Sequence, residues 1–153
     1  MINLKILLYK SEIEYVTSIK YLGVTVVSEK GIHFSAVDDL RNFYRAANSI
    51  LNTLNKPNEE VQMQLLYANC VPILSYACAV KDFKARDFMD CNTALNDAIR
   101  KIFSFHRWES VRALREGFGY PSLTEIFEKA KTKFHSRLTS HHNGVISWLA
   151  TCQ

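Results

Sequence analysis

The chain has few of the residues that build phosphate loops, metal clusters and membrane spans. Its five glycines are scattered, so they cannot form a glycine-rich loop around a phosphate. Its four cysteines include no Cys-x-x-Cys pair, which argues against structural zinc, because such sites take ligands from closely spaced pairs. No apolar run reaches the roughly 18 residues of a membrane helix, so we expect no contact with a membrane.

Catalytic arrangements are equally scarce. His141, His142 and Cys152 lack the spacing of zinc ligands, so we expect buried or idle thiols and no metal site. The pair Asp38-Asp39 lies at the start of an expected helix, and we interpret it as helix-start charge. No Ser-His-Asp or Cys-His arrangement follows from the spacing. The sequence therefore predicts neither an independent active site nor a cofactor in this chain.

What the chain does have is enough apolar material for a core. Its 153 residues are 48% apolar, which predicts one folded domain, or two small packed subdomains, and argues against disorder. Residues 1–9 are briefly apolar but carry no basic leader and no small-residue cleavage site. We therefore predict a nuclear or cytoplasmic protein that is not secreted, with reduced thiols.

Positive charge is concentrated in the last third of the chain. Before Arg100 there are ten Lys or Arg and eleven Asp or Glu, a net charge of −1. From Arg100 onward there are nine Lys or Arg and four Asp or Glu, a net charge of +5. Such a distribution attracts phosphate backbones, and an ordinary solvated helix face is the alternative interpretation.

Strand patterns come first along the chain. Residues 4–9 and 13–16 are two short strand candidates, separated by a polar turn at residues 10–12. In a third candidate at residues 21–27, Leu22, Val24 and Val26 share one face. Gly23 inside this pattern predicts a bulge or a close approach to the backbone. Together these segments predict a small antiparallel sheet that needs a helix to cover its apolar face.

Helix patterns begin after a loop over residues 28–34. Apolar residues recur at three- and four-residue steps, which predicts a helix of about 20 residues with Ser35 as its N-cap. Its stripe consists of Val37, Leu40, Phe43, Tyr44, Ala47, Ile50, Leu51 and Leu54. Pro57 ends this helix, and Asn58 is the expected cap of the next one.

Three more helices are predicted before residue 117. The first begins after Asn58 with Glu59 and Glu60 in its first turn, carries apolar residues from Val61 to Ala77, and contains Pro72, which should kink or split it. The second begins at Asp82, and the third is a short helix around residues 108–115 that ends at Gly117. The inward side of the second is formed by Phe88, Cys91, Leu95, Ile99, Ile102 and Phe103.

The clearest local signal lies in the last third. After a turn at residues 117–121, Ser122-Leu123-Thr124-Glu125 matches a capping box before an apolar run. The helix that follows should end at Asn143-Gly144, before a short final segment. Its inward residues are Phe127, Ala130, Phe134 and Leu138, and its basic side carries Lys129, Lys133 and Arg137.

Three motifs resemble the reverse transcriptases of non-LTR (LINE-type) retrotransposons. The first is Lys20-Tyr21-Leu22-Gly23-Val24, similar to the strand that leaves the palm of the family and helps to form its primer grip. The second is Leu65-Leu66-Tyr67 followed by Val71-Pro72-Ile73-Leu74-Ser75-Tyr76, which resembles the thumb helices. The third, over residues 94–105, contains Leu95 and Ile99-Arg100-Lys101-Ile102-Phe103 and resembles the arginine-containing helix beyond them.

The chain also departs from the family pattern. Val27-Ser28 stand where an acidic residue is common, and Phe34 stands where a tryptophan often precedes the first thumb helix. The tyrosine-glycine pair is Tyr76-Ala77, and no tryptophan follows it in residues 79–81. These changes keep apolar bulk, as expected for a divergent or decaying copy.

The resemblance implies an α+β fold that is mainly α, with a small N-terminal antiparallel sheet and a helical thumb-like bundle. Residues 1–34 would be a palm-edge β segment, residues 35–105 the bundle, and residues 106–153 a basic helical extension. The catalytic aspartates and their Mg²⁺ would belong to a palm upstream of Met1. This chain alone is therefore expected to be inactive as an RNA-directed DNA polymerase.

The resemblance also implies a partner, a template–primer duplex of RNA and DNA bound weakly and without sequence specificity. Tyr21, Leu22 and Gly23 are the primer-grip candidates. Candidates for contact with the phosphate backbone are Arg41, Arg45, Arg100, Lys101, Lys129, Lys133 and Arg137. For each basic residue the alternative is an ordinary surface charge, and for Tyr21 it is a core aromatic.

Two other functions stay open at this stage. The same helical fold could serve as a protein-interaction module or be an inert retroelement remnant, with the sheet over residues 4–26 docking on a palm domain or on a second copy. An unrelated helical enzyme or regulator is the third hypothesis.

Overall fold

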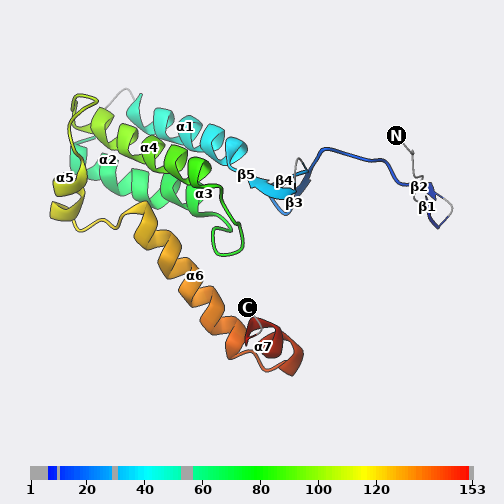
Figure 1. The fold of residues 1–153 in the computed structure, drawn as a ribbon. Coiled ribbons are helices and arrows are strands. Elements are labelled where there is room, and N and C mark those ends of the chain that lie inside the picture. The colour runs from blue at the N-terminus through cyan, green and yellow to red at the C-terminus, as the bar shows by residue number, and fades with distance from the viewer. Residues whose placement is uncertain (1–6, 10, 29–30, 53–56, 152–153) are drawn as a thin grey trace.

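The computed structural model describes residues 7–9, 11–28, 31–52 and 57–151. Two small antiparallel sheets come first, followed by helices (Figure 1). Strands β1 (Leu7–Leu8) and β2 (Ser11–Glu12) form a hairpin far from the helices (Figure 1). Strands β3 (Ser18–Tyr21), β4 (Val24–Ser28) and β5 (Ile32–Ser35) form a three-stranded sheet in that order, beside the first helix. The predicted fold class, mainly α with a small antiparallel sheet, is confirmed.

The strands of the sheet are not the predicted ones. Residues 13–16 are irregular, and the predicted strand over residues 21–27 is a hairpin whose two-residue turn is Leu22-Gly23. Both turn residues have positive φ, 47° at Leu22 and 78° at Gly23, as a hairpin turn that matches strand twist requires. Strand β5 occupies much of the predicted loop at residues 28–34. Within the predicted strand at residues 4–9, residues 4–6 lie outside the described residues.

Four helical segments enclose the main core. They are α1 (Val37–Leu51), α2 (Glu59–Leu65), α3 (Val71–Ser75) and α4 (Ala85–Ile102). Their buried side chains meet in one cluster that extends to the start of α6. Fully buried members include Phe43, Met63, Leu66, Leu74, Cys91, Leu95, Ile99 and Leu123.

Pro72 splits the second predicted helix, as expected. Residues Leu66–Cys70 between α2 and α3 form a π-helical turn, and Pro72 stands in the first turn of α3. Proline lacks an N–H and crowds the carbonyl four residues earlier, which favours such a widened turn. Helix α3 ends at Ser75 rather than at Ala77, whose φ is 55°.

Several predicted helix ends differ from the structure. Helix α1 starts at Val37 with Ala36 at the N-cap position, and the hydroxyl of Ser35, the predicted cap and the last residue of β5, accepts a hydrogen bond of 3.3 Å from the Val37 N–H. Helix α4 starts at Ala85 rather than at Asp82. The Asn58 cap is confirmed, since its side chain accepts a hydrogen bond of 2.9 Å from the Val61 N–H. The predicted inward positions Val37 and Tyr44 are 58% and 40% exposed, while Leu54 lies outside the described residues.

The C-terminal helices are α5 (Arg112–Gly117), α6 (Leu123–Thr139) and α7 (Gly144–Thr151). Both hydrogen bonds of the predicted capping box are present between Ser122 and Glu125. Helix α6 extends away from the bundle (Figure 1), so Phe127 is buried while Phe134, predicted to face inward, is 37% exposed. Helix α6 ends at Thr139, before Asn143, and the segment after Asn143 forms a further helix.

Among the described residues, no helix combines the length and the hydropathy needed to cross a bilayer.

Candidate nucleic-acid interface

The three primer-grip candidates form the tip of the β3–β4 hairpin. Tyr21 is 68% exposed and Leu22 is 72% exposed, so both side chains are accessible to a ligand. The alternative interpretation of Tyr21 as a core aromatic is therefore wrong. The chain reverses here through a turn with two positive φ values, and Gly23 adopts its value without strain.

Tyr76, at the end of α3, fixes this tip to the helical bundle. Its hydroxyl donates a hydrogen bond of 2.9 Å to the carbonyl oxygen of Leu22. A Cβ added to Gly23 would lie 3.3 Å from a ring carbon of Tyr76, so glycine permits the close approach expected from the sequence. Two of the three motifs noted in the sequence, residues 20–24 and 71–76, thus meet in space.

Both carboxylates of the Asp38-Asp39 pair interact with other side chains of this chain. Asp38 accepts a hydrogen bond of 3.0 Å from the Thr25 hydroxyl and lies 3.2 Å from Arg41 and 3.7 Å from Lys20. The Thr25 hydrogen bond, aided by the two cations, lowers the pKa of Asp38. Asp39 lies 2.6 Å from the Lys81 ammonium in the protein interior. Both carboxylates therefore have structural partners, in agreement with their interpretation as helix-start charge.

The basic candidates on α1 are accessible. Arg41 and Arg45 are both exposed and stand one turn apart. Arg41 pairs with Asp38 on the surface, and Arg45 makes a long hydrogen bond of 3.5 Å to Asn42. Exposed pairs of this kind contribute little to stability, so either guanidinium can exchange its partner for a phosphate.

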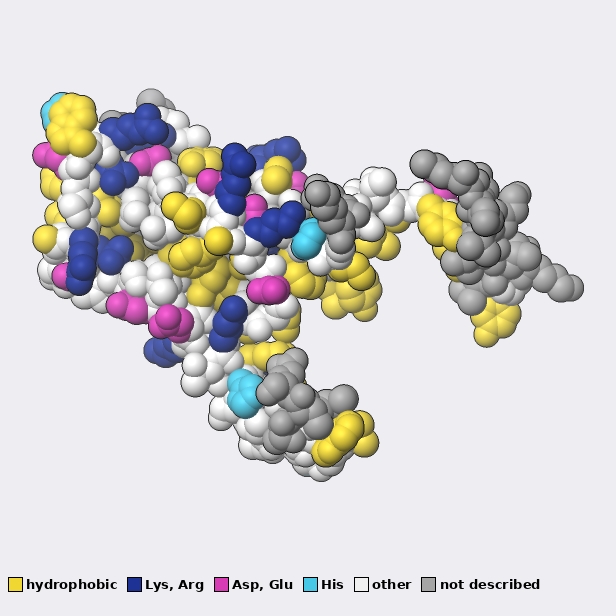
Figure 2. Space-filling model, viewed as in Figure 1, with side chains coloured by type: hydrophobic (Ala, Val, Ile, Leu, Met, Phe, Trp, Pro, Cys, Tyr) yellow, Lys and Arg dark blue, Asp and Glu magenta, His cyan; other side chains and the backbone are white. Residues whose placement is uncertain are grey.

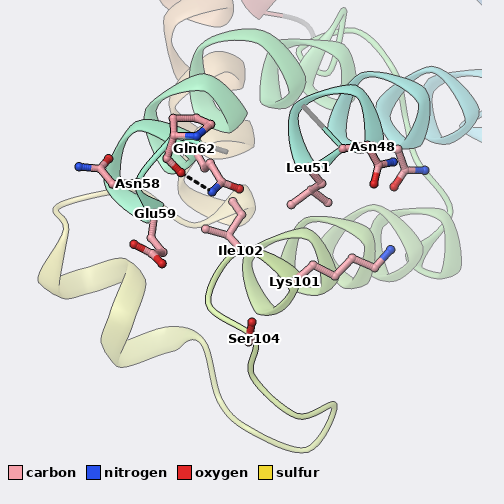
Figure 3. A pocket seen from close by; sticks show the side chains of 10 residues that line it. Asn48, Leu51, Asn58, Glu59, Gln62, Lys101, Ile102 and Ser104 are labelled. Atoms are coloured by element: carbon pink, nitrogen blue, oxygen red, sulfur yellow. Dashed lines mark hydrogen bonds between the residues drawn. The ribbon is translucent and has the colours of Figure 1, made fainter. Parts of the chain in front are cut away.

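The two candidates on α4 differ from each other. The Arg100 side chain is only 19% exposed, and its guanidinium donates to the Glu109 carbonyl at 3.0 Å and to Asp97 at 2.8 Å. This geometry gives Arg100 a structural role, holding the segment after α4 against the helix. Lys101 is exposed and lines a pocket of about 600 Å³ between the ends of α1 and α4 and the start of α2 (Figure 3).

That pocket has a mostly polar lining. Gln62 projects toward it from α2 and donates a hydrogen bond of 2.8 Å to the Pro57 carbonyl (Figure 3). Among the lining residues that the structure describes, Lys101 is the one cation, and Glu59 is an acid across from it. Because Lys101 and Glu59 carry opposite charges, the pocket favours neither an anion nor a cation, and we assign it no ligand.

Helix α6 carries basic side chains on two sides. Lys129, Lys133 and Arg137 are exposed, as the spacing predicted. Lys131 and His135 occupy the other side and line two adjoining hollows. This second pair could not be identified from the sequence, because its neighbours come from residues 79–82, about fifty positions earlier in the chain.

One face of the three-stranded sheet is apolar and uncovered. Directly paired residues share a face, which places Ile19, Val26 and Phe34 together, with Tyr21 and Val24 beside them. Ile19 is 57% exposed, and hydrophobic side chains gather along one side of the sheet in Figure 2. The opposite face carries Lys20 and Thr25, which contact Asp38.

The described cysteines behave as core residues. Cys70, Cys78 and Cys91 are buried free thiols. Desolvation raises the pKa of Cys91 to about 12, so this thiol stays protonated at neutral pH. Within residues 7–9, 11–28, 31–52 and 57–151, no three His, Cys, Asp or Glu side chains lie close enough to hold a metal ion.

Comparisons with protein families, with curated proteins and with solved structures found no match for this chain. The resemblance to non-LTR reverse transcriptases therefore stays a prediction.

Proposed function

We propose that this chain is a thumb-like unit of the non-LTR reverse transcriptase type. It would bind the sugar-phosphate backbone of a template–primer duplex and perform no chemistry itself. The observation that carries the proposal is the contact of Tyr76 with Leu22 and Gly23. A primer-grip hairpin must be held rigidly against the thumb if the two are to follow one duplex. The two motifs of the resemblance meet through this hydrogen bond, 54 positions apart in the sequence.

The accessible groups suit a backbone ligand. Tyr21 and Leu22 offer exposed apolar surface at the hairpin tip, where the sugar of a primer end could pack. Arg41 and Arg45 stand on α1, the helix that follows the sheet directly, and can bind phosphates as bidentate donors. Backbone contacts of this kind position a duplex without reading its sequence. Lys101, Lys129, Lys133 and Arg137 remain further candidates, whereas Arg100 is better explained by its structural hydrogen bonds.

In such an assembly the catalytic aspartates and Mg²⁺ would be supplied by a palm domain outside this chain. The uncovered apolar face of the sheet, with Ile19, Val26 and Phe34, is the surface on which that palm would dock. The same face favours a second candidate function, a protein-interaction module that associates with itself or with another partner.

Arg41→Ala is expected to weaken binding to an RNA–DNA primer–template duplex roughly fivefold, because it removes one charge-assisted phosphate contact. The slope of log K against log salt should become shallower by about 1. Fluorescence anisotropy across a salt series measures both quantities. Arg45→Ala should behave in the same way.

The matched control is Arg112→Ala on α5. Arg112 is also an exposed arginine in a surface ion pair within one helix, here with Glu116 at 2.8 Å. Arg112→Ala should leave the affinity for the duplex and the slope of log K against log salt nearly unchanged. Equal effects of Arg41→Ala and Arg112→Ala would contradict a duplex path over α1. A self-associating chain that binds no duplex at low salt would favour the interaction module instead.

A further inference from the structure

The segment that follows α3 carries the residue that holds the hairpin tip. Residues 76–81, called the α3 turn below, begin with Tyr76 and end with Lys81. Ala77 has a φ of 55°, a left-handed conformation that is unfavourable for a residue with a Cβ. The N–H groups of Val80 and Lys81 donate to the Ala77 carbonyl at 3.0 and 2.9 Å. These bonds fix the shape of the α3 turn, and contacts outside it fix its position.

The Lys81 ammonium connects the α3 turn with α1. It lies 2.6 Å from the carboxylate of Asp39, in the first turn of α1, and the Lys81 side chain has no exposed surface. The same ammonium lies 5.7 Å from the centre of the Tyr76 ring and 5.6 Å from that of Phe83, within the range of cation–π attraction. One buried cation therefore contacts α1, the ring of Tyr76 and the segment that precedes α4.

Stability alone does not account for an ion pair at this place. Replacing a buried ion pair by apolar residues of similar volume is often neutral or stabilising, because the desolvation of two charges offsets their attraction. What the pair adds is direction. The short contact with Asp39 fixes the place of the ammonium, and the ammonium in turn favours one position of the Tyr76 ring.

We propose that Asp39 and Lys81 are positioning residues for the hairpin tip and act through Tyr76. The contacts run from the Asp39 carboxylate to the Lys81 ammonium and from there to the Tyr76 ring. The hydroxyl of that ring donates the hydrogen bond of 2.9 Å to the Leu22 carbonyl. The buried pair thus sets the place of a turn that is itself exposed.

Asp38 complements this arrangement from the neighbouring position of α1. Its carboxylate accepts a hydrogen bond of 3.0 Å from Thr25 on β4 and lies 3.7 Å from the ammonium of Lys20 on β3. Two consecutive carboxylates therefore hold one hairpin, Asp38 at its strands and Asp39 at its tip. The tip then keeps a fixed place relative to the arginines of α1. The consequence for duplex binding rests on the proposed function, whereas the positioning itself does not.

The test is amide hydrogen exchange of the free chain in the double replacement Asp39→Leu with Lys81→Met, which removes both charges and keeps apolar volume. Amides of the β3–β4 hairpin should exchange about fivefold faster than in the wild type, because one desolvated cation–π contact no longer orients Tyr76. Amides of α4 should not accelerate more than about twofold. In a Tyr76→Phe background, the same double replacement should accelerate the hairpin by less than about twofold, because its route to Leu22 is already broken.

Met63→Ala is the control for a general loss of stability. Met63 is a fully buried residue of α2, so its truncation should accelerate α4 and leave the hairpin within about twofold of the wild type. Unchanged hairpin exchange in the double replacement, equal acceleration of hairpin and α4, or the same acceleration with and without the Tyr76 hydroxyl would each overturn the positioning role.

Duplex affinity separates this inference from the proposed function. The looser tip of the double replacement should also weaken binding of the RNA–DNA primer–template duplex about threefold. A hairpin that exchanges faster while duplex affinity stays at the wild-type value would support the positioning role and contradict the duplex path over the hairpin.

Discussion

Lys81→Ala is expected to lower the free energy of unfolding by about 3–5 kcal/mol, the usual effect of removing one partner from a buried ion pair. The Lys81 side chain is fully buried, and its ammonium lies 2.6 Å from the Asp39 carboxylate. Alanine would leave Asp39, itself only 7% exposed, without a countercharge in the interior. The change also removes the ammonium that lies 5.7 Å from the Tyr76 ring and 5.6 Å from the Phe83 ring.

Urea unfolding followed by circular dichroism measures this loss. The double replacement Asp39→Leu with Lys81→Met should be far milder than Lys81→Ala, because it removes both charges and keeps apolar volume. Lys101→Ala, at an exposed position of α4, should stay within about 0.5 kcal/mol of the wild type. A loss below about 1 kcal/mol in Lys81→Ala would mean that the carboxylate of Asp39 is solvated instead of paired.

Phe43→Ala should cost a similar amount, about 3–5 kcal/mol, because it opens a cavity in the middle of the core. Phe43 has no exposed surface and lies on α1, where it packs into the cluster shared with α3 and α4. Without the Phe43 side chain, α1 would be held less firmly against the bundle. Arg41 and Arg45, which lie on the same helix, would then be less well positioned for a duplex.

Tyr44 is the matched control for Phe43. It is the next residue, has an aromatic ring of similar size, and is 40% exposed. The two rings touch edge to face with centroids 5.8 Å apart, so Tyr44→Ala should cost about 1 kcal/mol through that contact. Thermal unfolding of both variants checks the ranking. Equal destabilisation would contradict the orientation of α1 described above.

Local signals could be predicted from the sequence. The capping box at Ser122 and the cap at Asn58 depend on residues three positions apart, and both are present. The buried stripe of α4, with Cys91, Leu95 and Ile99, followed from helical periodicity. The split at Pro72 followed from the missing N–H of proline.

The hairpin at residues 21–24 could not be predicted in the same way. Apolar alternation continues through its turn, and Leu22 at positive φ gives none of the Asn-Gly or Asp-Gly signals of such turns. The turn also has a partner outside the hairpin, because the Tyr76 hydroxyl, 54 positions away, donates a hydrogen bond to the Leu22 carbonyl. Strand β5 was missed for a related reason, because it pairs with β4 across a part of the chain that was predicted to be a loop.

In the candidate site, too, features set by local sequence could be predicted, whereas contacts between distant residues could not. The exposed basic residues of α1 and α6 were visible from their spacing. The structural role of Arg100 depends on Glu109 in the segment after α4, and the partner of Asp39 is Lys81, 42 positions away. The hollow between α6 and the turn after α3 likewise depends on residues about fifty positions apart in the chain. Single-sequence patterns reveal faces of helices, but they do not reveal what stands opposite each face.

Whether the hairpin and α1 contact a duplex can be measured by amide hydrogen exchange of the chain with and without a saturating RNA–DNA primer–template duplex at low salt. We expect slower exchange in the β3–β4 hairpin and in the first turns of α1 when the duplex is bound. In Tyr76→Phe, which loses the hydrogen bond to Leu22, the hairpin should exchange faster in the free chain and gain less protection from the duplex. Duplex binding that leaves the exchange of residues 18–28 unchanged would contradict a duplex path over the β3–β4 hairpin.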